Sequence, residues 1–138
     1  MNADAEDLSR FYRRGGRILI YHGVSDPVFS VNDLIAWHGR VNRFEHGNAD
    51  RFLRIYAVPG MNHGGGGPAT DQFDAFGALV SWREHGIEPE ALVATAGPAT
   101  PWPGRTRLLC PYPQQPRRTG SDIESASSFH CTTPARRP

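Results

Sequence analysis

Asp26 and His63 are the residues whose types and positions could do chemistry. Asp26 comes shortly after an apolar run that ends at Gly23, and His63 comes shortly after a second run that ends at Val58. A carboxylate can accept a hydrogen bond from the Nδ1–H of an imidazole, which fixes the tautomer and leaves Nε2 free to take a proton from a nucleophile. The two residues therefore predict the acid and the base of a catalytic triad.

Two short apolar runs predict the strands that carry these residues. Residues 17–23 and 52–58 are typical of strands buried on both faces of a parallel sheet. A strand–helix–strand crossover places successive loops at the same edge of such a sheet, where open α/β sheets bind their ligands. Either residue alone would be interpreted as a turn aspartate before Pro27 or an ordinary loop histidine. The matching positions of Asp26 and His63 favour catalysis.

Two helices are expected to cover the strands. Apolar residues recur at three- and four-residue spacing from Val31 to Phe44, with Ser30 or Asn32 available to cap the first turn, and predict a helix that ends near Gly47. A second helical repeat covers 71–85, where Gly86 is well placed to end it. We interpret the aromatic residues at these spacings as core packing rather than as a carbohydrate platform: Trp37, Tyr56, Phe73, Phe76 and Trp82.

The sequence after Ala96 predicts an irregular tail. Prolines 98, 101, 103, 111, 113 and 116 are too dense for a regular helix or an interior strand. A disulfide between Cys110 and Cys131 would organise this tail, contribute about 3 kcal/mol in the chain-entropy model and imply an oxidising compartment. The alternative is two unrelated free thiols.

The order of acid and then base predicts an α/β-hydrolase, in which a serine nucleophile precedes both along the chain. Only Ser9 and Ser25 precede Asp26, and neither lies in a G-x-S-x-G elbow. We therefore expect the fold class to be α/β, as the C-terminal part of an α/β-hydrolase parallel sheet with flanking helices. Residues 1–100 would be that portion of the catalytic domain, and 101–138 the proline-rich tail. An N-terminal portion or partner fragment would supply the nucleophile.

Other site chemistries fit the sequence less well. His22, Asp26, His38 and His63 could be metal ligands, but no H-x-x-x-H spacing of a helical zinc site is present. The glycine-rich residues 60–67 could cradle a phosphate, but a P-loop requires G-K-[ST] and this chain has no lysine. We expect neither a metal nor a cofactor.

Charge and hydropathy exclude other classes of partner. The chain has 15 basic and 14 acidic residues and a formal charge of +1, so no overall field would attract nucleic acid or anionic lipid. No apolar run approaches the ~18–20 residues of a membrane helix, and residues 1–9 are acidic and polar, unlike a signal peptide. We expect a small-molecule substrate, no nucleic acid and no membrane.

Three segments carry a resemblance to a known family. Residues 16–27 (GRILIYHGVSDP), 58–68 (VPGMNHGGGGP) and 105–114 (RTRLLCPYPQ) are similar to the acid-bearing segment, the histidine loop and the C-terminal ending of the tannase and feruloyl esterase family. Cys131 lies near the place of that family's last cysteine. The resemblance extends from about Leu8 to Cys131.

The resemblance implies that Asp26 is the triad acid and His63 the general base, acting on esters of phenolic acids such as gallate or ferulate. It also implies that a full-length relative is secreted or periplasmic. The family's lid domain, which often holds calcium, is inserted upstream of Asp26 and is absent here. The family usually has a cysteine directly after the histidine, bonded to a cysteine before the nucleophilic serine, whereas this chain has Gly64.

A non-catalytic interpretation stays open beside the enzymatic one. The chain would then be a truncated, inactive product, or an interaction module that has lost the nucleophile. An upstream reading frame that contains a serine elbow would distinguish a broken esterase gene from a self-contained small protein.

Overall fold

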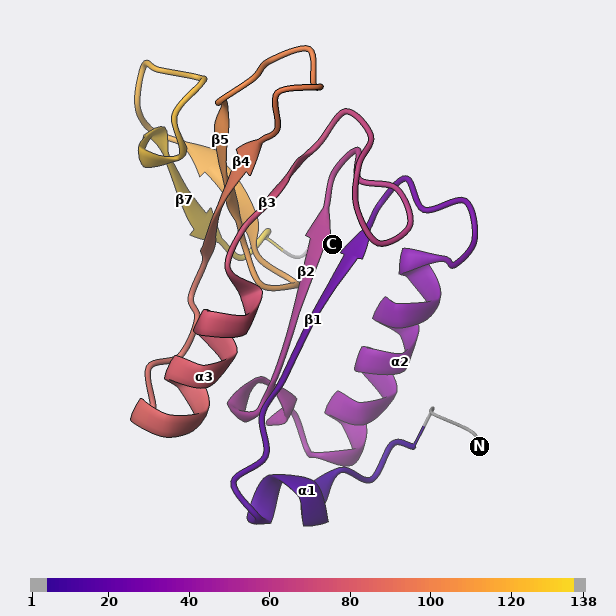
Figure 1. Ribbon diagram of the computed structural model, residues 1–138. Coiled ribbons are helices and arrows are strands. Elements are labelled where there is room, and N and C mark those ends of the chain that lie inside the picture. Colours follow the sequence, from indigo (N-terminus) through magenta and orange to yellow (C-terminus); the bar gives the residue numbers. More distant parts are fainter. Residues whose placement is uncertain (1–4, 136–138) are drawn as a thin grey trace.

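Two parallel strands form the centre of the molecule. The structure is a computed structural model that describes residues 5–135. In it, β1 (Ile18–Gly23) and β2 (Leu53–Val58) run in parallel, with Ile18 opposite Leu53 and Gly23 opposite Val58. Both strands therefore end at the same edge of the sheet, as the crossover rule predicts (Figure 1).

The two faces of this sheet enter separate hydrophobic cores. The core on the side of α2 (Val31–Phe44) has as its buried members Val41, Ala49, Phe52, Leu53 and Ile55. The core on the side of α3 (Ala75–His85) has as its buried members Tyr56, Val58, Met61, Ala69, Leu92, Ala94 and Leu109. Because alternate residues of β2 enter different cores, both faces of the strand are covered, and α2 and α3 flank the strands in Figure 1.

Capping residues set the ends of both helices. The Ser30 hydroxyl accepts a hydrogen bond from the Asn32 N–H at 3.2 Å, so Ser30 is the cap of α2. The Asp74 carboxylate accepts the Gly77 N–H at 2.7 Å at the start of α3. Gly86 ends α3 with a φ of 71°, a left-handed conformation that glycine adopts without steric cost.

The predicted start of the second helix at residue 71 is wrong. β3 (Thr70–Gln72) pairs in an antiparallel manner with β4 (Leu92–Ala96), so the backbone at residue 71 is extended rather than helical. β4 also pairs with β5 (Thr106–Leu109). This second sheet packs beside β2, where the Tyr112 N–H also donates to the Ile55 carbonyl at 2.8 Å.

Part of the tail is regular, although its prolines predict an irregular segment. β5 lies beyond residue 100 and pairs with β4, so this ladder joins the two expected parts of the chain. β6 (Gln115–Arg118) pairs with β7 (Phe129–Thr132) in an antiparallel hairpin. Pro116 is tolerated in β6 because this strand pairs with β7 alone among the described strands, and an edge strand can contain a residue without an N–H.

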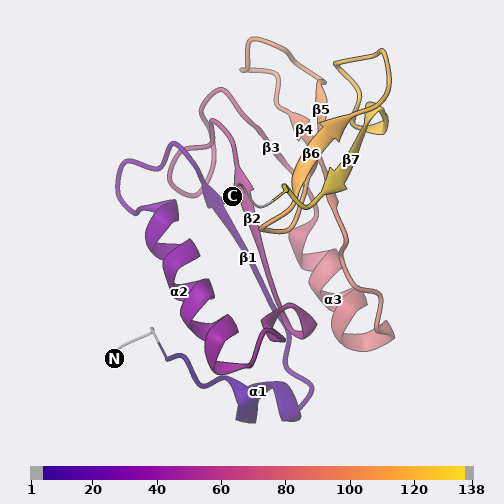
Figure 2. The ribbon, with the colours of Figure 1, turned by 180° about the vertical axis from the view of Figure 1, so that it is seen from behind.

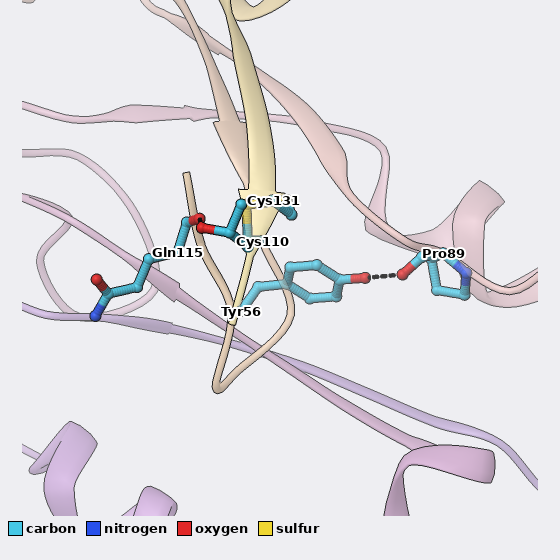
Figure 3. Close-up of a disulfide and its surroundings, with 6 residues drawn as sticks. Tyr56, Pro89, Cys110, Gln115 and Cys131 are labelled. Carbon is cyan, nitrogen blue, oxygen red and sulfur yellow. Dashed lines mark hydrogen bonds between the residues drawn. A yellow bond between two sulfur atoms is a disulfide. The ribbon is translucent and has the colours of Figure 1, made fainter. Parts of the chain in front are cut away.

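Cys110 and Cys131 form the predicted disulfide, with a Cα–Cα distance of 5.5 Å. Cys110 follows β5 and Cys131 lies in β7, so the bond ties the hairpin to the second sheet (Figures 2 and 3). Beside it in Figure 3, the hydroxyl of Tyr56 donates to the Pro89 carbonyl at 2.5 Å. Burial raises the pKa of Tyr56 to about 12.

Phe76 is the aromatic residue whose predicted burial is wrong. Tyr56 and Trp82 are buried and Trp37 and Phe73 are partly buried, whereas Phe76 is 78% exposed. The core contact of α3 includes Ala78, and residues two apart on a helix point in nearly opposite directions. Because α3 is apolar on more than one side, its sequence does not indicate which side packs.

Short helices complete the described chain. α1 (Ser9–Arg13) and the 3₁₀ turn η1 (Ala49–Arg51) lie near the start of the strands, where the Tyr12 and Phe52 rings stack with centroids 5.0 Å apart. A second 3₁₀ turn, η2 (Ala126–Ser128), precedes β7. Within residues 5–135, no helix is both long enough and apolar enough to cross a membrane.

Candidate active site

The structure brings Asp26 and His63 together at the carboxyl ends of β1 and β2. Asp26 lies in the loop after β1, and His63 lies in the loop after β2. Nδ1 of His63 is 2.9 Å from Oδ2 of Asp26. An ionised carboxylate can only accept, so the proton of this bond is on Nδ1. This is the hydrogen bond that the sequence predicts.

Asp26 is held as a buried carboxylate. Its side chain is 4% exposed, and Oδ1 accepts the backbone N–H groups of Val28 at 2.7 Å and Phe29 at 3.1 Å. Burial raises the pKa of Asp26, but the hydrogen bonds from His63 and from the two backbone N–H groups outweigh burial and lower the pKa from 3.8 to about 2. The carboxyl group is therefore charged at neutral pH and can stabilise an imidazolium.

His63 presents its other ring nitrogen outward. The side chain is 55% exposed, and Nε2 makes no hydrogen bond within the described part of the chain. The Phe29 ring lies beside the imidazole, with centroids 5.4 Å apart and planes tilted by 51°. This arrangement leaves Nε2 available for proton transfer.

Four consecutive glycines shape the loop that carries His63. The φ angles of Gly64, Gly65, Gly66 and Gly67 are 73°, 153°, 72° and 83°. Glycine adopts such angles readily, whereas a cysteine at position 64 would be strained. The family's usual cysteine at this position would therefore not fit the conformation that this loop adopts.

The sequence did not predict three sets of contacts at the site, made by Asp26, His22 and Asp71. The Asp26-Pro27 pair is a signal for the turn in which an aspartate accepts nearby backbone N–H groups, but it does not identify the donors. His22, considered only as a metal ligand, donates Nδ1–H to the Gly23 carbonyl at 2.8 Å, and its Nε2 lies 3.7 Å from Asp26 Oδ2. Asp71 accepts a hydrogen bond from the histidine loop, and no sequence signal indicates it.

The four residues considered as metal ligands do not converge. His38 lies on α2, where its Nε2 is 3.6 Å from an Asp50 oxygen, apart from His22, Asp26 and His63. No group of three or more His, Cys, Asp and Glu side chains in residues 5–135 is arranged to hold a metal. The phosphate alternative is also weakened, because the Gly66 N–H already donates to a carboxylate.

A hollow of about 540 Å³ borders the pair. Its lining includes the Asp26 and His63 side chains together with Tyr21, Phe29 and Leu34. A larger hollow of about 780 Å³ lies between β2 and the tail, and neither Asp26 nor His63 lines it. A reacting group that uses His63 would therefore occupy the smaller hollow.

The two serines that precede Asp26 do not complete a triad. Ser9 begins α1, which precedes β1 and lies away from the carboxyl ends of the strands (Figure 1). Ser25 lies in the loop after β1, where its N–H donates to the Met61 carbonyl at 3.1 Å, and no hydrogen bond joins its hydroxyl to His63 in the described residues. Ser25 lies between β1 and α2 but in the sequence G-V-S-D-P, so neither serine lies in a G-x-S-x-G elbow.

The parallel strands and the helices that cover them have the arrangement of an α/β-hydrolase, and comparison with known proteins identifies the family. A profile of the family described as "Tannase and feruloyl esterase" matches residues 1–132. Mono(2-hydroxyethyl) terephthalate hydrolase of Piscinibacter sakaiensis is 44% identical over an alignment of 137 residues that covers 96% of this chain and 22% of that protein. The chain belongs to the tannase and feruloyl esterase family of ester hydrolases.

Further relatives agree with this assignment. The tannase of Aspergillus oryzae is 28% identical over an alignment of 137 residues that covers 91% of this chain and 22% of that protein. The crystal structure of an esterase from Aspergillus oryzae superposes with a TM-score of 0.79 at 24% identity, over 93% of this chain and 29% of that chain. This likeness confirms the predicted fold class. The chain spans about a quarter of the length of the relatives it matches.

Proposed function

We propose that this chain provides the acid and the base of a serine-type carboxylic ester hydrolase. Asp26 is the acid and His63 is the base. The observation that carries the proposal is the 2.9 Å hydrogen bond from His63 Nδ1 to Asp26 Oδ2, because it fixes the tautomer in which Nε2 can accept a proton. Membership of a family of ester hydrolases supports the reaction class.

The geometry supports a two-step acyl transfer. Nε2 of His63 takes the proton of a serine hydroxyl while the serine oxygen attacks the ester carbonyl, and it then gives that proton to the departing alcohol. Water attacks the acyl-enzyme in the second step, with His63 again acting as base and then as acid. Nδ1–H stays on the imidazole throughout, and the charged Asp26 stabilises the imidazolium formed in each step.

The serine comes from outside this chain in our proposal. A base activates only a nucleophile that is present, and neither Ser9 nor Ser25 occupies an elbow. Of the strands in the described residues, β1 pairs with β2 alone, so its other edge can accept a neighbouring strand that carries a serine elbow. The chain by itself is then inactive.

The proposed substrates are esters of phenolic acids, such as gallate and ferulate. The relative from Piscinibacter sakaiensis is named for an ester of terephthalate, which is also an aromatic acid. Tyr21 and Phe29 line the hollow beside His63 and could contact an aromatic acyl group. The disulfide favours an oxidising compartment, and a calcium ion belongs only to a lid domain outside this chain.

The test grafts this chain onto a complete enzyme. In the hydrolase of Piscinibacter sakaiensis, the segment that aligns with this chain is replaced by it, and turnover of methyl gallate, methyl ferulate and mono(2-hydroxyethyl) terephthalate is measured. We expect the graft to hydrolyse at least one ester, and His63→Ala to reduce kcat by about 10³-fold or more. His130→Ala is the matched control, because His130 lies exposed on β7.

Two outcomes would contradict the proposal. A graft that folds but shows no turnover dependent on His63 would favour the inactive fragment or interaction module. Turnover by the isolated chain that His63→Ala abolishes would show that this chain contains its own nucleophile.

A further inference from the structure

The tip of the histidine loop contacts the rest of the protein at few points. Within residues 5–135, two hydrogen bonds join residues 63–66 to side chains elsewhere, and a carboxylate is the acceptor in both. Asp26 holds the His63 ring, and Asp71 Oδ2 accepts the Gly66 N–H at 2.7 Å. A Cβ atom added at Gly64 or Gly66 would have no heavy atom within 4 Å, so packing does not support the tip there.

The loop needs such support because of its composition. A run of glycines loses more conformational freedom on ordering than any other sequence. One internal bond, from the Asn62 N–H to the Gly66 carbonyl at 3.1 Å, closes the tip without fixing its direction. The orientation of the tip relative to Asp26 therefore depends on a contact with a fixed part of the fold.

Asp71 is such a fixed part. It lies in β3 between Thr70, which is opposite Ala96 of β4, and Gln72, which is opposite Thr95; the register shifts between these two pairs, so Asp71 is held by its paired neighbours on either side. Its carboxylate makes a short, charge-assisted bond, a stronger kind than a bond between neutral groups. Because Gly66 is three residues from His63 in a tight loop, this bond restricts where the imidazole can lie.

We propose that Asp71 is a positioning residue for His63. By accepting the Gly66 N–H, it holds the loop in the conformation in which Nδ1 of His63 reaches Asp26. The catalytic meaning of this role rests on the proposed function, whereas the positioning itself is a property of the isolated chain.

The experiment measures the His63 tautomer in this chain alone. The chain is labelled with ¹⁵N-histidine, and the ring nitrogen shifts are recorded at about pH 8.5, two units above the ordinary pKa of histidine. His63→Gln identifies the signals. Free neutral histidine favours the Nε2–H form, so a dominant Nδ1–H form reports the bond to Asp26. We expect Nδ1–H to dominate in the unchanged chain and to become the minor form in Asp71→Ala.

Two further variants separate positioning from a loss of stability. Asp71→Asn keeps an oxygen that can accept the Gly66 N–H, and should retain the Nδ1–H form. Asp74→Ala removes the same kind of bond, an aspartate accepting a glycine N–H at 2.7 Å, but at the start of α3 instead of the loop. It should also retain the Nδ1–H form, while the far-UV spectrum of every variant stays unchanged.

Any of three results would overturn the proposal. Asp71→Ala could keep the Nδ1–H form, Asp71→Asn could lose it as fully as alanine does, or Asp74→Ala could lose it equally. The measurement requires no turnover, so the failure of ester hydrolysis in the graft and the failure of this proposal are distinguishable.

Discussion

The two oxygens of Asp26 accept hydrogen bonds from different groups. Oδ1 accepts the backbone N–H groups of Val28 and Phe29, which fix the rotation of the carboxylate, and Oδ2 accepts the imidazole of His63. The Asp26 carboxylate is therefore oriented by its own turn as well as by the histidine loop. Removing His63 should leave the carboxylate in place, whereas changing Asp26 should disturb both loops.

The pH dependence of stability provides a test of this carboxylate. The pKa of Asp26 is about 2 in the folded chain, below the value of about 4 for an unfolded aspartate. Ionised Asp26 thus stabilises the fold above about pH 4, and this contribution is lost as the pH falls toward 2. We expect the difference in thermal midpoint between the unchanged chain and Asp26→Asn to be smaller at pH 2 than at pH 6. An equal difference at pH 2 and pH 6 would contradict the assigned pKa.

At the scale of elements, α2 begins directly after the acid turn. Ser30 caps the helix and lies four positions after Asp26, so helix capping and the placement of the acid share one short segment. The sequence predicted this helix closely because an amphipathic repeat and a cap coincide. It did not distinguish Ser30 from Asn32, since both residue types cap helices equally well.

Replacing the cap should have a measurable effect on stability. Ser30→Ala removes the acceptor of the Asn32 N–H and is expected to lower the free energy of unfolding in urea by about 1 kcal/mol. Ser30→Asp retains an acceptor and should cost much less. Equal losses in both variants would mean that the hydroxyl has another role beside the hollow that it lines.

The second sheet was the part of the fold that the sequence indicated least. β3 is short, and its pairing with β4 depends on a partner more than 20 positions away, which no local pattern encodes. In the tail, the prolines correctly argued against a long helix. They also argued against a strand, and β6 was missed because an edge strand tolerates Pro116. Likewise, Asp71 has no local signal, since its partner is a backbone N–H in a loop.

The disulfide, which links the end of β5 in this second sheet to β7, should raise the free energy of unfolding of the chain. It closes a loop with a sequence separation of 21, for which the chain-entropy model gives about 3 kcal/mol. We expect the Cys110→Ser, Cys131→Ser double variant to unfold at a lower urea concentration than the oxidised chain. A reductant should lower the midpoint of the unchanged chain and leave that of the double variant where it is. No difference between oxidised and reduced chains would contradict the prediction.

At the scale of the whole molecule, the edge of β1 that does not face β2 determines whether we expect the isolated chain to associate. The Ile18 N–H donates to the Phe52 carbonyl and the Val24 N–H donates to the Val58 carbonyl, so even-numbered residues of β1 face β2. The N–H groups of Leu19 and Tyr21 consequently point to the other edge, where no strand of the described residues pairs. Such an edge is a template for pairing with another chain.

The isolated chain should therefore associate through β1, and one residue can test this. Tyr21→Pro removes an N–H from the unpaired edge and leaves the ladder to β2 intact, whereas Ile20→Pro removes an N–H that β2 uses and should unfold the chain. Sedimentation velocity should show association of the unchanged chain that rises with concentration, and mostly monomer for Tyr21→Pro. Tyr21→Ala, the control for the lost ring contact with Phe73, should still associate because it keeps the N–H. If the unchanged chain stays monomeric, or if Tyr21→Ala suppresses association as fully as proline does, the backbone edge is not the cause.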